Sequence, residues 1–421
     1  MESMLIRNAR FVLAPGKVLE NHDILVEDGK ISKMGRGLKG DDVIDASGKL
    51  VMPGLINTHT HSPMVLFRGA GDDMPLMDWL QKRIWPLEAK LTKEDIKAGA
   101  KLALAEMIRS GTTCFCDMYW HMEQIAEAVT EAGMKAVLSW AVVNKDMTTQ
   151  KEEPLKAAEA FIQQWRGKNG IYPSVGPHAI YTCSKETLLA AKCISEKYGV
   201  LEHFHLSETK KELDDCMKSN GMRPAEYLKS IDFFTHGALA AHCVWLSDDE
   251  IRILARAGVS ASHCPASNMK LASGVMPLKR MHDAGVNITL GTDGAASNNT
   301  LDMFDAMRLT AFLHKVEGTD PTAAKARDVL RMATANGAWA LGLNSGEIAP
   351  KKDADLLILD IDRPHWKPAW DPVSNLVYSA KSADVDTVIC SGRVVMAEGE
   401  IVTFDEKKAI RDAEEAKAKL G

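Results

Sequence analysis

Short runs of apolar and β-branched residues alternate with helical stretches along the middle of this 421-residue chain. This alternation restricts the fold most, because strands separated by helices pair in parallel sheets. Eight such strands are predicted, at 55–60, 112–117, 135–140, 171–177, 200–205, 238–243, 258–263 and 287–292. Eight strand and helix units within about 300 residues are typical of a (β/α)8 barrel of the TIM type, an α/β fold. A doubly wound open sheet is the alternative, but the glycine fingerprint that such sheets have after the first strand is missing.

Both ends of the chain are rich in strand signals and differ from the middle. Near the N-terminus, apolar and polar residues alternate on both sides of Asp28-Gly29, a strong hairpin signal. Near the C-terminus, Ser391-Gly392 and Glu398-Gly399 separate further apolar runs. Each end is too small to close a core alone, so we predict that both pair in one small β-sandwich. The predicted domains are residues 1–54 (first part of the sandwich), 55–350 (barrel) and 351–421 (second part of the sandwich and a C-terminal helix).

Composition argues against several classes of protein. With 57 acidic and 51 basic residues the net charge is −6, so we expect no broad basic face and no binding of nucleic acid. No apolar stretch reaches the roughly 18 residues of a membrane span, and the first residues lack the apolar segment of a signal peptide. We therefore expect a cytoplasmic protein without a membrane partner. Eight scattered cysteines favour reduced, buried thiols over a disulfide framework.

Candidate metal ligands lie at the C-terminal ends of the predicted strands, where barrel enzymes have their active sites. His59 and His61 end the first strand, and residues two apart in a strand point to the same face. His205 ends the fifth strand, whereas His203 lies one layer deeper and is predicted to be structural. Asp293 ends the eighth strand. Three imidazoles and one carboxylate leave a position for water on one divalent ion, which suits Zn²⁺; Fe²⁺, Mn²⁺ or Ni²⁺ would accept the same ligands.

Two other side chains at strand ends are candidates for moving protons. Glu208 lies three residues beyond His205, an offset that allows it to stay off the metal, and His242 ends the sixth strand. Asp293 could bind the metal and also take a proton from its water. A metal-activated water beside acids and bases indicates hydrolytic chemistry.

These motifs strongly resemble the amidohydrolase superfamily. The segments that support this resemblance are Pro53–His61, His205–Glu208, Ala241–Cys243 and Gly291–Gly294. Other segments are similar to the 5-methylthioadenosine/S-adenosylhomocysteine deaminase group, which includes archaeal 5'-deoxyadenosine deaminases. These segments are Leu66–Asp73, Asp78–Leu80, Trp85–Glu88, Gly176–Ser184 and Pro265–Gly274. The likeness covers nearly the whole chain.

The resemblance implies a metal-dependent hydrolytic deaminase. Its expected substrates are adenosine-type nucleosides: 5'-deoxyadenosine, S-adenosylhomocysteine, 5'-methylthioadenosine and adenosine. It implies that one metal is held by four residues, namely His59, His61, His205 and Asp293. It also implies that Glu208 shuttles a proton to the purine ring, while His242 and Asp293 orient and deprotonate the attacking water.

The same resemblance implies three substrate contacts besides Glu208. Glu88 would accept hydrogen bonds from the ribose hydroxyls, His178 would donate to the purine, and Trp79 would wall the pocket for the 5' substituent. Members of the group commonly assemble, so we expect a homo-oligomer.

Two differences between this chain and the family's pattern restrict the expected number of metal ions and the expected 5' substituent. Relatives with two metals bridge them with a modified lysine near the end of strand four, but here that strand runs into Pro177-His178, so one metal is expected. No arginine occurs from Val142 to Glu159, so a charged 5' tail would need Arg68, Lys145 or a neighbouring subunit. A small or apolar 5' group is favoured.

Two alternative functions remain. An amidohydrolase acting on a free ring, such as a guanine or cytosine deaminase or a triazine hydrolase, would not use Glu88 and His178 as a ribose-bearing purine would. A non-catalytic scaffold would have lost metal ligands, whereas every expected ligand position is filled here.

Overall fold

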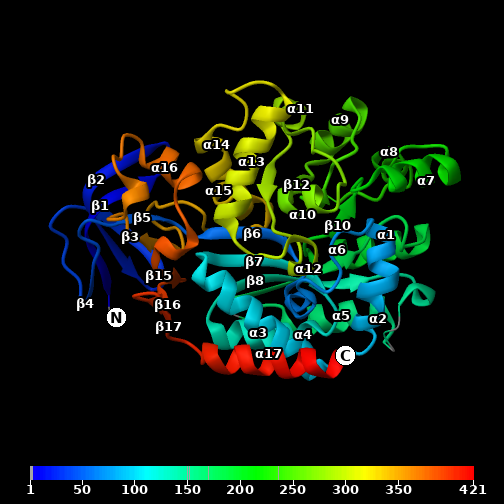
Figure 1. The fold of residues 1–421 in the computed structure, drawn as a ribbon, viewed down its shortest axis with the longest axis horizontal. Helices are drawn as coiled ribbons and strands as arrows, with labels where there is room; N and C mark the ends of the chain where they lie inside the picture. The colour runs from blue at the N-terminus through cyan, green and yellow to red at the C-terminus, as the bar shows by residue number, and fades with distance from the viewer. Residues whose placement is uncertain (1–2, 149, 151, 169, 236) are drawn as a thin grey trace.

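The computed structural model describes residues 3–421 except 149, 151, 169 and 236, and its strands form one large mixed sheet and two parallel sheets (Figure 1). The chain is therefore an α/β protein with parallel strands. Each of the eight predicted strands overlaps one strand of the parallel sheets. These are, in order, β6 (Leu55–Thr60), β7 (Thr112–Tyr119), β8 (Lys135–Val142) and β9 (Ile171–Pro177) in one sheet, and β10 (His203–Leu206), β11 (Leu239–His242), β12 (Ser260–His263) and β13 (Ile288–Leu290) in the other.

The two parallel sheets meet along both pairs of outer strands. On one side, Val175 of β9 forms an isolated parallel bridge with Glu202, just before β10. On the other side, the backbone N–H of Asp293, which follows β13, donates to the carbonyl of His59 in β6 at 2.9 Å. Residues 59 and 293 are thus neighbours in space although most of the chain lies between them.

Helices connect these strands, and local signals define the first long one, α3. Thr92 followed three residues later by Asp95 is a sequence pattern that predicts a capping box. The box is present: the Asp95 N–H donates to Thr92 Oγ1 (3.2 Å) and the Thr92 N–H donates to Asp95 Oδ2 (3.0 Å). Gly111 follows the helix with φ +80°, and a Cβ there would lie 2.6 Å from a Leu357 methyl carbon, so glycine is required. The helices are α1 (Leu76–Trp79), α2 (Trp85–Glu88), α3 (Lys93–Arg109), α4 (Met122–Ala132), α5 (Pro154–Trp165), α6 (Lys185–Tyr198), α7 (Lys210–Asn220), α8 (Pro224–Ser230), α9 (Asp248–Ala257), α10 (Pro265–Lys270), α11 (Leu278–Asp283), α12 (Ala295–Asn298), α13 (Met303–Glu317), α14 (Ala326–Met332), α15 (Ala335–Ala340), α16 (Pro372–Tyr378) and α17 (Glu406–Leu420).

Strands from both chain ends pair in a single nine-stranded sheet, seen at one side of Figure 1 where blue and orange-red strands lie together. The three predicted turns each join neighbouring strands, and Asp28 (φ +51°) and Gly29 (φ +73°) have the positive φ values of a type I′ turn. The sheet order is β17 (Glu400–Ile401), β16 (Arg393–Ala397), β15 (Val385–Cys390), β14 (Leu356–Leu359), β5 (Leu50–Pro53), β1 (Met4–Ala14), β2 (Lys17–Glu27) and β3 (Lys30–Gly35), with β4 (Asp42–Asp45) beside β1.

The mixed sheet has a buried apolar cluster of its own, which includes Ile24, Val51 and Ile358 and is separate from the larger cluster around the parallel strands. Helix α17, red in Figure 1, packs along α3, where Lys419 Nζ lies 3.2 Å from Asp95 Oδ1. All eight cysteines are free, and seven are buried. Within the described part of the chain, no helix has both the length and the apolar character needed to cross a bilayer.

Candidate metal centre and active site

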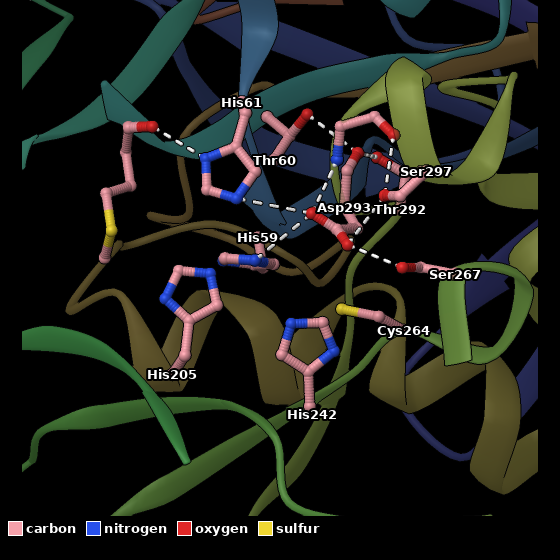
Figure 2. Close-up of polar contacts among 12 residues, drawn as sticks. His59, Thr60, His61, His205, His242, Cys264, Ser267, Thr292, Asp293 and Ser297 are labelled. Carbon is pink, nitrogen blue, oxygen red and sulfur yellow. Dashed lines mark hydrogen bonds and ion pairs between the residues drawn. The ribbon is translucent and has the colours of Figure 1, made fainter. Parts of the chain in front are cut away.

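Five side chains suited to metal binding point into one space at the carboxyl ends of the parallel strands (Figure 2). His59 lies in β6 and His61 directly follows it, His205 comes from β10, His242 from β11, and Asp293 follows β13. Their ligand atoms form two overlapping groups, His59–His205–His242 and His59–His61–Asp293, and within each group the atoms lie within 4.8 Å of one another. The structure thus brings the four predicted ligands together and places His242 beside them.

Hydrogen bonds orient three of these imidazoles. The Nδ1 of His61 lies 2.7 Å from a backbone carbonyl oxygen of β7, and the Nδ1 of His205 lies 2.9 Å from the carbonyl oxygen of His178. The Nδ1 of His242 lies 2.9 Å from the side-chain oxygen of Asn268. Because a carbonyl oxygen can only accept, Nδ1 carries the proton in each ring and Nε2 keeps its lone pair for a metal or a proton.

His59 has no carbonyl partner and faces another imidazole instead. Its Nδ1 lies 2.8 Å from the Nε2 of His203. Its own Nε2 is buried and has no hydrogen-bond partner among the described residues. A buried polar atom without a partner is costly unless a ligand satisfies it. This Nε2, which makes no hydrogen bond and has the Asp293 carboxylate 3.5 Å away, and the surrounding nitrogen and oxygen donors therefore fit a divalent cation.

Asp293 supplies negative charge to the centre. Its Oδ2 accepts hydrogen bonds from the hydroxyls of Ser267 (2.6 Å) and Ser297 (2.9 Å), and its Oδ1 lies 3.3 Å from His61 Nε2 and 3.5 Å from His59 Nε2. Burial opposes its charge, but the interactions with both imidazoles hold its pKa well below the usual 3.8. Burial likewise opposes a proton on His61, yet the Asp293 carboxylate raises that pKa to about 9. The centre thus favours a positive charge beside Asp293.

Glu208 lies beside the metal-binding side chains without joining either group. Its Oε2 is 3.9 Å from His242 Nε2, and burial raises its pKa. The turn before it is unusual, because Ser207 has φ +50°. The buried carboxylate of Glu212 on α7 accepts the backbone N–H groups of Ser207 and Glu208, each at 2.8 Å. Glu212 therefore fixes the turn that directs Glu208 towards the centre.

An open cavity lies over this centre, with about 690 Å³ of space when the solvent at its mouth is included. Trp79, Glu88, His178 and Glu208, the four predicted substrate contacts, all line it. The rest of the wall is mainly aromatic and aliphatic, and includes Leu76, Leu80, Ile84, Trp85, Trp120 and Tyr181.

Two polar side chains of the cavity wall, Glu88 and His178, belong to neither metal-binding group. Burial raises the pKa of Glu88 to about 7, and its Oε1 accepts a hydrogen bond from the Tyr119 hydroxyl at 2.8 Å. Burial lowers the pKa of His178 to about 3, with further lowering by the neighbouring histidines, so the ring is neutral. Its Nδ1 lies 2.9 Å from the Thr182 hydroxyl, which can donate or accept, so the ring can present an Nε2–H to a ligand.

Trp79 and Glu88 lie on one helical segment, in which a π-helical turn (Leu80–Ile84) separates α1 from α2. Pro86 has no N–H to donate to the preceding turn, which interrupts the regular α-helical pattern. Such π turns are frequent at functional sites. Here the turn lies between the two predicted pocket residues and itself supplies part of the wall.

The amidohydrolase family profile matches residues 50–395, most of the chain. The chain belongs to the amidohydrolase family. This amidohydrolase is 47% identical over 424 residues to the 5'-deoxyadenosine deaminase of Methanothermobacter thermautotrophicus, covering 100% of this chain and 99% of that protein. It is also 47% identical over 403 residues to the 5-methylthioadenosine/S-adenosylhomocysteine deaminase of Thermococcus onnurineus, covering 95% of each chain. The crystal structure of an adenosine deaminase from Xanthomonas campestris with bound zinc is similar with a TM-score of 0.96 and 34% identity, covering 99% of this chain and 98% of that one.

Sequence reasoning missed several residues of this amidohydrolase site. Tyr119 contacts Glu88, Asn268 contacts His242, and Glu212 orients the turn at Glu208. Asn268 lies within a recognised motif and Glu212 lies near one, but nothing in their spacing identifies their partners. Only the folded arrangement does so.

Proposed function

We propose that this amidohydrolase is a zinc-dependent deaminase that converts the 6-amino group of adenosine-type nucleosides to the inosine-type product and ammonia. The observation on which the proposal depends is the convergence of imidazole nitrogens and Asp293 beneath a cavity lined by Glu88 and His178. Relatives at 47% identity bear the names 5'-deoxyadenosine deaminase and 5-methylthioadenosine/S-adenosylhomocysteine deaminase, which supports the same substrate class. The proposed substrates are 5'-deoxyadenosine, 5'-methylthioadenosine, adenosine and S-adenosylhomocysteine.

The fold that supports this function is proposed to be a (β/α)8 barrel with a small β-sandwich. The hydrogen bonds at both junctions of the parallel sheets support a closed barrel over residues 55–350. The mixed sheet and its separate apolar cluster support a second domain of residues 1–54 and 351–421. The barrel places the strand ends that bear the metal ligands around one opening.

One metal ion is proposed, held by His59, His61, His205 and Asp293. Zinc suits these nitrogen and oxygen donors, and Fe²⁺, Mn²⁺ or Ni²⁺ would fit the same set. Strand β9 ends at Pro177 and offers no lysine to bridge a second ion. Zinc in such a site lowers the pKa of a bound water to about 7 and so supplies a hydroxide nucleophile at neutral pH.

The side chains around the centre can move the protons of the reaction. His242 keeps a free Nε2 lone pair because its Nδ1 proton faces Asn268, so His242 and Asp293 can orient the water and accept its proton. Glu208, whose pKa is raised by burial, holds a proton for the purine N1. The water oxygen then bonds to C6, the C6–N6 bond breaks, and the proton taken from water leaves with ammonia. The second proton of the water oxygen passes to Glu208, which is thereby protonated again, and C6 becomes the carbonyl of the inosine-type product.

The cavity wall is proposed to recognise the nucleoside. Glu88 accepts the ribose hydroxyls, His178 donates to the purine, and Trp79 lies beside the 5' group. The two basic residues considered for a charged 5' tail do not line this cavity: Arg68 binds Glu106, and Lys145 donates to backbone oxygens of residues 150 and 152. Positions 149 and 151 of that stretch lie outside the described residues. Neutral 5' groups should therefore bind better than a carboxylate tail.

The test is direct. Purified zinc-loaded protein is incubated with 5'-deoxyadenosine, guanine and cytosine, and ammonia release is measured together with the ultraviolet change from adenine to hypoxanthine. Activity on the nucleoside alone supports the proposal, whereas activity confined to a free ring would support the alternative amidohydrolase function. A cytoplasmic location and a homo-oligomeric state stay predictions from the sequence.

A further inference from the structure

β10 contains a second buried histidine, His203, which contacts the proposed metal ligand His59. Its Nε2 lies 2.8 Å from His59 Nδ1, and the two rings meet edge to face with centroids 4.9 Å apart. Its other nitrogen, Nδ1, lies 3.2 Å from the Ser139 hydroxyl and 3.4 Å from the Cys116 thiol. All four side chains are completely buried. Both ring nitrogens of His203 therefore contact protein groups, and His203 does not line the cavity.

The Nδ1 of His59 faces an imidazole nitrogen, whereas the Nδ1 atoms of the other imidazoles at the centre face carbonyl oxygens. His61, His205 and His242 have their Nδ1 atoms against carbonyl oxygens, which can only accept and therefore fix the tautomer by themselves. An imidazole nitrogen can accept or donate. His59 offers its Nε2 lone pair to a cation only if His203 accepts the Nδ1 proton of His59.

We propose that His203 is a positioning residue of the metal centre, which accepts the Nδ1–H of His59 and so holds the His59 Nε2 lone pair towards the cation. The neighbouring hydroxyls allow His203 to be an acceptor at that nitrogen, because the Ser139 hydroxyl can accept a proton from His203 Nδ1. When its Nδ1–H donates to Ser139, its Nε2 is left with a lone pair, and Ser139 in turn lies 2.6 Å from the Ser174 hydroxyl. This inference rests on the metal site of the proposed function and adds a residue to which neither the motifs nor the cavity assigned a role.

Two amide variants separate acceptance at His59 from packing. In His203→Gln, the amide extends to about the place of the lost Nε2, so an oxygen can still accept from His59. In His203→Asn, the amide ends at about the place of Nδ1, so it can contact Ser139 but cannot reach His59. Both variants remove the ring and insert the same polar group, so they differ mainly in reach.

His263 provides a matched control. It is a fully buried histidine on β12 whose Nε2 pairs with another imidazole, His314 Nε2, at 3.0 Å. It does not line the cavity and belongs to neither metal-binding group. His263→Asn therefore repeats the loss of a buried imidazole pair at a position outside the cavity lining and both metal-binding groups.

The experiment measures the zinc dissociation constant of metal-stripped protein by competition with a chromophoric chelator, and thermal unfolding of the same metal-free samples. Loss of a residue that orients a metal ligand typically weakens binding by about 10- to 100-fold, and we expect this for His203→Asn. We expect His203→Gln to retain most of the wild-type affinity and His263→Asn to retain all of it. A difference in folding would appear as a difference in unfolding temperature, and we expect the two metal-free His203 variants to unfold at the same temperature.

Three outcomes would overturn the inference alone: wild-type affinity in His203→Asn, an equal loss in both His203 variants, or an equal loss in His263→Asn. Failure of His203→Asn to fold while His203→Gln folds and binds zinc would also count against it, because the contact would then serve stability. A wild-type protein that binds no zinc would overturn the proposed function together with this inference. Zinc binding without deamination would overturn the function and leave the inference standing.

Discussion

Replacement of Glu88 by glutamine separates a nucleoside deaminase from an enzyme that acts on a free ring. Glutamine has nearly the same shape, and its amide oxygen can still accept the hydrogen bond that Tyr119 donates at 2.8 Å. What changes is the acceptor for the ribose, because a carboxylate with two accepting oxygens becomes an amide with one. Folding and metal content should therefore be preserved while ribose binding is lost.

The size of the effect follows from the burial of Glu88, which is only 8% exposed. A hydrogen bond to a charged group contributes about 1.5–3 kcal/mol, and the variant loses at least one such bond to a ribose hydroxyl. At roughly 1.4 kcal/mol per factor of ten, kcat/KM for adenosine should fall by about 10- to 150-fold. We expect most of this loss in KM, because Glu88 contacts the ribose rather than the reacting C6.

The assay compares adenosine with 2',3'-dideoxyadenosine in wild type and in Glu88→Gln, using the ultraviolet change on deamination, with metal content measured on both proteins. For wild type, kcat/KM should be lower for 2',3'-dideoxyadenosine than for adenosine. For Glu88→Gln, the two substrates should have nearly the same kcat/KM. Unchanged adenosine kinetics in the variant would refute the ribose contact. An equal loss on both substrates would also refute it, because the effect would then not depend on the hydroxyls.

Three other predictions follow from the same site. Glu208→Gln should lower kcat by about 100- to 10,000-fold while zinc content stays at the wild-type level, and steady-state rates near those of wild type would show that Glu208 is not the proton donor. In a panel of 5'-modified adenosines, kcat/KM should be at least about tenfold higher for 5'-deoxyadenosine and 5'-methylthioadenosine than for S-adenosylhomocysteine, since no lysine or arginine of the described residues lines the cavity; equal values would contradict this. Burial raises the pKa of Glu88 to about 7, so below that pH its carboxyl is protonated and accepts ribose hydroxyls poorly; KM for adenosine measured against pH should fall as the pH rises through 7, and the Glu88→Gln variant should lack this change.

Sequence patterns were most informative where the signal is local. The capping box at Thr92 and the hairpin at Asp28-Gly29 depend on residues a few positions apart, and both occur as predicted. Strand positions followed from apolar runs, but their bounds shifted. Strand β10 begins at His203 instead of residue 200, and β13 ends at Leu290, because the chain then turns to give Asp293 a φ of +60°.

The candidate site was predictable only in part, for a physical reason. Residues two apart in a strand share a face, so His59 and His61 could be paired from spacing alone. Contacts between neighbouring strands and loops have no such rule. The pairs His59–His203 and Glu88–Tyr119 join residues from different segments, and their side chains meet only when the elements pack.

Zinc titration of metal-stripped protein in the presence of 5'-deoxyadenosine tests the central claim most directly, with ammonia release as the measurement. If His59, His61, His205 and Asp293 hold a single ion that activates water beneath the nucleoside, the rate should rise in proportion to added zinc and level off at one zinc per chain. No ammonia from the fully loaded protein, or a rate that keeps rising to a second equivalent, would contradict it.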